Sequence, residues 1–271
     1  MIAYLDTNAF DHIYKKIGCT GADIANLRKA IYGRQLSIRL SVHTLEEILL
    51  GRKVSPQALA AQIKLTLSLA SARTLVKSCA QLLLDDIRAY AARGEADRPF
   101  LRGDTQNAVA DGIAALIESD GEELEDDFLA VLEQARQEKQ HFFAALEQAR
   151  ATSSPPSGWT GFEQCFDAAA LSALETLVER AGVAKPCRER GLDGLLKIKS
   201  VRMSLCVALA PGYEQMASGS VVNSTSLHHA VSAAAAAETF VSDIAANREF
   251  LARMPMEGLN VATLPEFLER L

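Results

Sequence analysis

The sequence opens with the stretch Ile2-Ala3-Tyr4-Leu5-Asp6-Thr7-Asn8-Ala9-Phe10, a short apolar run that ends on a carboxylate and two small polar residues. Such a run is typical of a strand buried on both faces of a parallel sheet. We therefore expect a strand over residues 2–5, with Asp6 at its carboxyl end. Open α/β sheets bind ligands at that end, although an Asp in this position also serves as the N-cap of a following helix.

Three later segments predict further strands. Residues 36–40 alternate apolar and polar side chains and run into a helix over residues 41–50. Residues 239–242 are a short run that ends on Asp243, which repeats the form of the first strand. Residues 259–264 predict one more strand before a closing helix. The two ends of the chain thus predict one parallel β-sheet flanked by helices.

The middle of the chain, residues 55–200, shows helical periodicity and no convincing strand. We interpret it as a large all-α insertion or cap within a discontinuous core of residues 1–54 and 201–271. Residues 151–158 contain paired prolines among small polar residues and form the clearest linker. The expected fold class is α/β, a three-layer fold with an all-α insertion.

The composition and charge argue against several classes of protein. The chain has 271 residues and a formal net charge of -6, which argues against a surface built throughout for nucleic-acid binding. Residues 118–127 contain seven acids and no base, which suits a solvated face or a contact for a basic partner. The five cysteines lack any C-x-x-C spacing, so reduced thiols are favoured over disulfides. With no apolar run of bilayer length and no signal segment, we expect a cytoplasmic protein without membrane contacts.

Asp6, Glu47 and Asp243 would share one edge of the sheet if the strands before them are parallel. Clustered carboxylates repel one another unless protons or a cation neutralise them, and hard ions such as Mg²⁺ or Mn²⁺ prefer oxygen ligands. Such an ion can orient a water molecule and lower its pKa for attack on a phosphodiester. A structural alternative exists for Glu47, because Thr44 and Glu47 have the spacing of a capping box. The adjacent Glu46 would point about 100° away on the helix, and so away from the site.

Three segments resemble the motifs of PIN-domain nucleases, a family that includes many toxin ribonucleases of toxin–antitoxin pairs. Leu5-Asp6-Thr7-Asn8 resembles the opening motif, and residues 41–50 resemble the second, whose Glu is a metal ligand. The segment from His229 to Asp243 is similar to the last motif, in which a helix of small residues leads to a strand and a further acid. The resemblance covers roughly residues 1–54 and 220–271.

The resemblance implies a PIN-like fold and a metal-dependent endoribonuclease. Asp6, Glu47 and Asp243 would then be the catalytic residues and the ligands of Mg²⁺ or Mn²⁺, and RNA, single-stranded or structured, would be the substrate. A protein partner such as an antitoxin, or a homodimer, would also fit the family. Hydrogen bonds to the carboxylates or to a water are expected from four small polar residues: Thr7, Asn8, Ser226 and Ser242.

One position departs from the family pattern. The third acid of the family begins the helix before the last motif, and the chain has Ser226 there, with the uncharged Asn223 nearby. Ser226 suits an N-cap. Because loss of a carboxylate weakens a hard-ion site, either another acid such as Asp193 or Asp11 replaces it, or the site is degenerate.

Two alternatives to an active nuclease remain. The first is a PIN-like module that has lost catalysis and binds nucleic acid or a protein partner, which Ser226 favours. The second is a phosphohydrolase of the haloacid-dehalogenase type, which we discount because it needs an Asp where the chain has Asn8. We interpret His228 and His229 as packing or surface residues, since Mg²⁺ sites rarely use imidazole.

Overall fold

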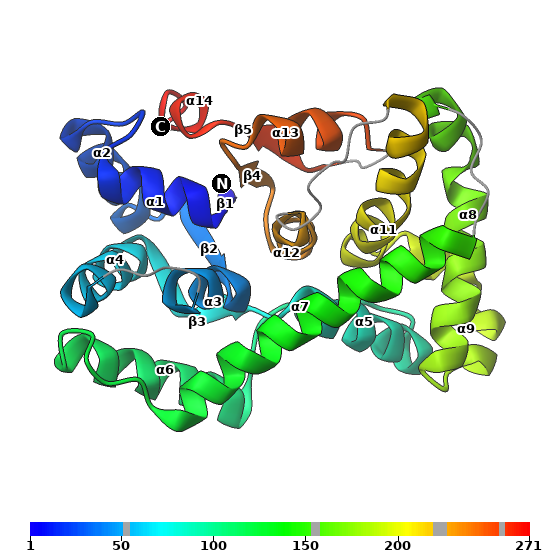
Figure 1. Ribbon diagram of the computed structural model, residues 1–271, viewed down its shortest axis with the longest axis horizontal. Helices are drawn as coiled ribbons and strands as arrows, with labels where there is room; N and C mark the ends of the chain where they lie inside the picture. The colour runs from blue at the N-terminus through cyan, green and yellow to red at the C-terminus, as the bar shows by residue number, and fades with distance from the viewer. Residues whose placement is uncertain (51–54, 153–157, 219–226, 255–257) are drawn as a thin grey trace.

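Figure 1 shows a computed structural model of the chain, which describes residues 1–50, 55–152, 158–218, 227–254 and 258–271. The strands are β1 (Ile2–Leu5), β2 (Ser37–Ser41), β3 (Ala70–Val76), β4 (Thr239–Val241) and β5 (Asn260–Ala262). The helices are α1 (Thr7–Lys15), α2 (Gly21–Tyr32), α3 (Val42–Leu50), α4 (Pro56–Leu69), α5 (Cys79–Arg93), α6 (Gly103–Glu118), α7 (Asp126–Thr152), α8 (Gly158–Arg180), α9 (Ala184–Arg190), α10 (Leu192–Leu196), α11 (Lys199–Ser218), α12 (His228–Ala236), α13 (Ala245–Ala252) and α14 (Leu264–Leu268).

The strands of the described residues form one parallel sheet in the order β3-β2-β1-β4-β5. The central strand, β1, pairs with β2 on one side and with β4 on the other. From β1 the chain builds the sheet outward to β3, then crosses to β4 and continues outward to β5. The order therefore reverses between β1 and β4, and open α/β sheets bind ligands beyond the carboxyl ends of the strands at such a reversal.

The sheet lies between two hydrophobic cores. Since side chains alternate along a strand, successive residues of β1 belong to different cores. Ala3 and Leu5 pack into a core that also contains residues of α1, α2, α3, α4, α6 and α14. Tyr4 belongs to the opposite core, together with residues of α5, α8, α11 and α12. Full burial of one large apolar side chain contributes about 1.5–3 kcal/mol, so a strand buried on both faces is held firmly in register. The apolar run at the start of the chain predicts this arrangement, and the structure confirms it.

The long helix α7 connects the two cores. Phe128 and Leu132 near its start belong to the core that contains Leu5, whereas Phe142 belongs to the core that contains Tyr4. Figure 1 shows α7 running past α3 and towards α8, and it packs against α3, α5, α6 and α11. The middle of the chain therefore reaches the carboxyl edge of the sheet through α7.

The parallel sheet and the strands near residues 2–5, 36–40 and 239–242 are confirmed, and β5 is shorter than predicted. The prediction of no strand in residues 55–200 is wrong, because β3 pairs with β2 at the edge of the sheet. Residues 55–93, which belong to the segment with helical periodicity, instead form α4, β3 and α5. The sequence of β3, ASARTLV, lacks regular alternation, and its register against β2 shifts at an irregularity. The division into a core and an insertion stays a prediction.

The ends of α5 follow the local sequence closely. Ser78 is its N-cap and accepts a hydrogen bond from the backbone N–H of Gln81. Gly94 ends the helix in the left-handed conformation, which glycine adopts without steric strain. Of the predicted linker, residues 153–157 lie outside the described part. Of the described helices, none is both long and apolar enough to cross a bilayer.

Candidate active site at the carboxyl edge of the sheet

Asp6 lies at the carboxyl end of β1 and is the N-cap of α1. Its Oδ1 accepts the backbone N–H of Ala9 at 2.7 Å. The side chain is buried, and Oδ2 has no hydrogen bond of standard geometry to any described residue. Burial raises the pKa of Asp6, while the charge of His229 and the nearby Ser242 side chain oppose that shift. Asp6 therefore caps the helix with one oxygen and leaves the other for a further contact.

Asp243 follows β4 after Ser242, and both of its carboxylate oxygens face protein donors. Oδ2 lies 2.6 Å from Nδ1 of His12 on α1, and Oδ1 accepts the backbone N–H of Leu264 at 2.8 Å. These contacts join the end of β4 to α1 and α14. Asp243 is close enough for its negative charge to raise the pKa of Asp6. The two acids are thus neighbours at the reversal of the strand order.

The start of α3 decides how Glu47 is placed. The helix begins at Val42, directly after β2, and the hydroxyl of Ser41 accepts the backbone N–H of Thr44 at 3.3 Å. Thr44 consequently lies inside the first turn, where it cannot act as the N-cap. The Thr44–Glu47 capping box is wrong, because Ser41 takes the capping role. Glu47 is left with its carboxylate available for contacts outside α3.

The carboxylate of Glu47 faces four donors from three helices. Thr7 donates its hydroxyl to Oε2 at 2.6 Å, and Nε2 of His229 lies 3.1 Å from the same oxygen. Nε2 of His228 lies 3.0 Å from Oε1, and Nζ of Lys139 lies 3.3 Å from it. Burial alone would raise the pKa of Glu47, but the facing His229 and His228 hold it well below its usual range. Glu47 is therefore an ionised carboxylate at the centre of a polar network.

Glu46 shares the charge of Lys139 with Glu47. Nζ of Lys139 lies 2.5 Å from Oε2 of Glu46, and the side chains of Lys139 and Glu46 are both largely buried. Burial raises the pKa of Glu46, and the contact with Lys139 opposes that shift. The sequence predicts that Glu46 points away from the site. In the structure, Glu46 pairs with Lys139, and Lys139 in turn contacts Glu47.

His228 and His229 form the start of α12, and both are buried, with 0% and 2% of their surface exposed. The alternative of a surface position is therefore wrong. Both rings also turn Nε2 towards Glu47, and the ring centroids are 4.2 Å apart. Burial and the adjacent His229 lower the pKa of His228 to about 3, so this imidazole is neutral at pH 7.

Two more buried side chains orient this histidine pair. The hydroxyl of Tyr4 lies 2.7 Å from Nδ1 of His229 and 2.6 Å from Oγ of Ser41. The ring of His43 packs edge-on against His228, and its Nε2 accepts the backbone N–H of Cys79 at 3.1 Å. Burial and the nearby His228 keep the pKa of His43 well below its usual value. His43 is therefore neutral, with its proton on Nδ1.

Sequence reasoning missed Tyr4, His43 and Lys139. The spacing of Tyr4 from Asp6 could have indicated it, because residues two apart on a strand face the same side. His43 precedes Glu47 by one helical turn, which places both on one helix face. No local pattern marks Lys139, since α7 comes from the segment that we interpret as an insertion.

The remaining predicted site residues differ in their burial and in their partners. Ser242 is fully buried beside Asp6, and Asn8 is partly buried in the first turn of α1. Ser226 lies outside the described residues. Of the two acids suggested as replacements, Asp11 pairs with Lys15 at 2.8 Å and Asp193 is exposed on α10.

The ligand atoms of Glu47, His228 and His229 all lie within 4.8 Å of one another. Within the described ranges, this is the one group of three or more His, Cys, Asp or Glu side chains that is so close together. Asp6 and Asp243 lie outside the group. The three predicted carboxylates thus belong to one edge of the sheet, but Glu47 converges with two imidazoles rather than with the other two acids.

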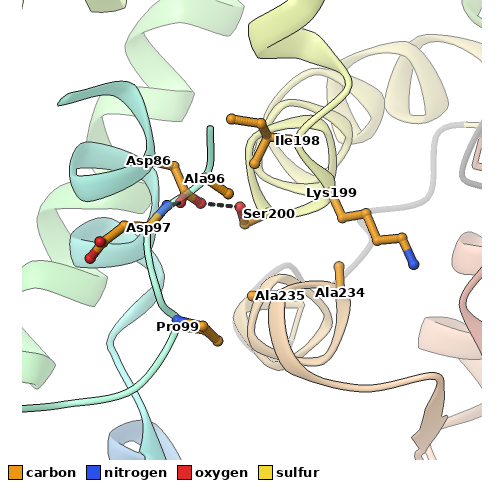
Figure 2. A pocket seen from close by; sticks show the side chains of 9 residues that line it. All are labelled: Asp86, Ala96, Asp97, Pro99, Ile198, Lys199, Ser200, Ala234 and Ala235. Atoms are coloured by element: carbon orange, nitrogen blue, oxygen red, sulfur yellow. Dashed lines mark hydrogen bonds between the residues drawn. The ribbon is translucent and has the colours of Figure 1, made fainter. Parts of the chain in front are cut away.

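A separate cavity of about 210 Å³ lies between α5, α11 and α12 (Figure 2). Its polar wall is Asp86, which accepts hydrogen bonds from the Ser200 hydroxyl and from the backbone N–H of Asp97. Figure 2 shows the Lys199 side chain extending away from Asp86. Because Asp86 and Ser200 are hydrogen-bonded to each other, this cavity offers a ligand fewer polar groups to bind than the carboxyl edge does.

Comparisons with protein-family models, with curated proteins and with solved structures find no match for this chain. Its function has therefore to be inferred from the fold and from the arrangement of its side chains.

Proposed function

We propose that the chain is a PIN-like, metal-dependent nuclease that hydrolyses RNA phosphodiester bonds at the carboxyl edge of β1 and β4. The observation that supports this proposal is the position of Asp6 and Asp243 at the ends of the paired strands β1 and β4, where the backbone N–H of Asp6 donates to the carbonyl of Val241 at 3.1 Å. Glu47 stands on the helix that follows the neighbouring strand β2. Each segment that resembles a PIN motif therefore brings its acid to the same edge, where α/β sheets bind ligands.

Mg²⁺ or Mn²⁺ is the cofactor implied for such a nuclease, but the three acids do not fit an all-oxygen site as they stand. Asp6 suits it best, because Oδ2 is buried without a hydrogen bond of standard geometry to the described residues. Both oxygens of Asp243 already take N–H donors, and Glu47 faces two imidazoles and Lys139. Hard ions prefer oxygen ligands, so the nitrogen-rich surroundings of Glu47 favour a softer ion.

The chain's own residues could serve hydrolysis in two ways. Burial raises the pKa of Asp6, which favours the protonated form and suits a carboxyl group that holds and moves a proton. Thr7, which follows Asp6, fixes the orientation of Glu47 through its hydroxyl. The same short turn after β1 thus positions both a proton carrier and an ionised carboxylate.

A second candidate function is a PIN-like module without catalysis, which binds nucleic acid, an antitoxin-like protein or a second copy of the chain. The observation that favours it is that the Glu47 carboxylate already has partners within the protein: Thr7, His229 and Lys139. A carboxylate whose hydrogen bonds are supplied within the protein can be held in place without an ion.

The test is cleavage of labelled single-stranded and hairpin RNA by the full chain with Mg²⁺, Mn²⁺ or Zn²⁺, and with EDTA. We expect metal-dependent cleavage that falls about 100-fold or more in Asp6→Asn, the loss typical of a removed proton carrier. Asp111→Asn, which removes an exposed acid of α6, should cleave like the wild type. RNA or protein binding without cleavage under any ion would instead support the second candidate.

A further inference from the structure

The group formed by Glu47, His228 and His229 has the composition of a transition-metal site. We propose that these three residues bind one Zn²⁺ ion through a carboxylate oxygen and two imidazole nitrogens. Zn²⁺ is bound by His nitrogen and Glu oxygen, and two histidines with one glutamate form a known class of three-ligand zinc site. The site shares Glu47 with the proposed nuclease but does not depend on that function.

The distances within the group suit a small ion. Nε2 of His228 lies 3.0 Å from Oε1 of Glu47, and Nε2 of His229 lies 3.1 Å from Oε2. Two ligands that are each ~2.0–2.1 Å from a tetrahedral ion are ~3.3 Å from each other. Each imidazole nitrogen is therefore already near that separation from one oxygen of Glu47, and all the ligand atoms lie within 4.8 Å of one another.

Binding needs a free lone pair on each Nε2, and the surroundings of His229 favour it. The proton of a neutral imidazole can occupy Nδ1 instead, so no net proton has to leave the ring. For His229, the hydroxyl of Tyr4 lies 2.7 Å from Nδ1 and can accept that proton in a hydrogen bond. Metal-bound histidines characteristically make such a bond with their second nitrogen, which fixes the tautomer and the ring orientation. Ser41, 2.6 Å from the same hydroxyl, holds Tyr4 in place.

The charge around Glu47 leaves room for a cation. Lys139 lies closer to Glu46, at 2.5 Å, than to Glu47, at 3.3 Å. One lysine thus serves two carboxylates, and a divalent ion would supply the positive charge that the pair lacks. The ion would also replace the hydrogen bond between Nε2 of His229 and Oε2 of Glu47.

The exposure of the group indicates an open coordination position. The side chain of Glu47 is 28% exposed, whereas those of His228 and His229 are 0% and 3% exposed. The ion would therefore be reached past Glu47. Three protein ligands with one solvent-facing position is the arrangement of catalytic rather than structural zinc sites.

The test is calorimetric titration of metal-depleted full-length protein with Zn²⁺ in the absence of RNA, with metal content measured after dialysis. We expect one equivalent to bind and a 100-fold excess of Mg²⁺ not to displace it. Glu47→Gln and His229→Gln should each weaken binding by more than 10-fold. Tyr4→Phe, which keeps the ligands, should weaken binding by about 10-fold. His141→Gln, which removes an exposed imidazole on α7, is the matched control and should bind like the wild type.

A folded variant is recognised by an unchanged far-ultraviolet circular dichroism spectrum. A Co²⁺-loaded wild type should show the visible absorption of a tetrahedral site, and folded Glu47→Gln should lack it. The proposal is overturned if the wild type binds no Zn²⁺, or if folded Glu47→Gln and His229→Gln bind it as tightly as His141→Gln. Zinc binding without RNA cleavage would contradict the nuclease proposal alone, so the two proposals fail separately.

Discussion

Replacing Glu47 by Gln should destabilise the metal-free protein by about 2–3 kcal/mol. The carboxylate faces Thr7 and His229 through one oxygen and His228 and Lys139 through the other. A hydrogen bond to a charged group contributes about 1.5–3 kcal/mol, against about 0.5–1.5 kcal/mol for a neutral pair. Each of the two shortest contacts therefore loses about 1 kcal/mol, and the Gln amide group adds an N–H where the network supplies donors.

The assay is urea unfolding followed by circular dichroism in EDTA, with Glu249→Gln on the exposed face of α13 as control. The control removes the same charge and should change stability by less than about 0.5 kcal/mol. The pKa of Glu47 is lowered in the folded state, so its contribution is present above 4.5, its ordinary value, and is lost as the pH falls below it. The difference between wild type and variant should therefore shrink in acid. Equal stability of the two variants at pH 7 would refute the role assigned to this carboxylate.

Three further predictions concern regions away from the site. Burial raises the pKa of Asp86, so the folded state gains stability relative to Asp86→Asn as the pH falls from 7 towards 3.8, and unfolding at several pH values checks this. Gly112→Ala should cost about 1–3 kcal/mol, because its Cβ would lie 2.3 Å from Cβ of Phe128, whereas Gly21→Ala meets nothing within 4 Å and should not lower the thermal midpoint. Lys77→Met should cost up to about 3 kcal/mol in urea unfolding, since Lys77 is buried and lies 2.7 Å from each of two carboxylates that retain some solvent contact.

The part of the fold that local sequence determines was predictable. A strand with apolar side chains on both faces, such as β1, can only be stable inside a sheet covered on both sides, and its residues show this directly. β3 escaped prediction because it is an edge strand whose register is irregular and whose sequence does not alternate. Its place beside β2 depends on long-range pairing, which no short pattern encodes.

The candidate site, like the fold, was predictable only where local sequence determines it. Asp6 and Asp243 were predictable as neighbours, because each follows a strand and parallel strands bring their carboxyl ends together. The partners of Glu47 were not, since His228 comes from α12 and Lys139 from α7, and only tertiary packing brings these helices to α3. The capping box was a reasonable local expectation, but it failed because the helix starts earlier.

The charge at the carboxyl edge separates the two proposed functions. Asp6, Asp243, Glu46 and Glu47 bring four carboxylates to this edge, and Lys139 is the one lysine or arginine that pairs with any of them in the described part of the chain. A phosphate approaching such a surface is repelled, by about 1 kcal/mol per charge at 4 Å in water and by more beside a protein. A bound divalent cation would offset two of these negative charges and give the phosphate a positive centre to contact. Binding of RNA at this edge therefore requires an ion, so a chain without one would have to bind RNA elsewhere or use this edge for a basic protein partner.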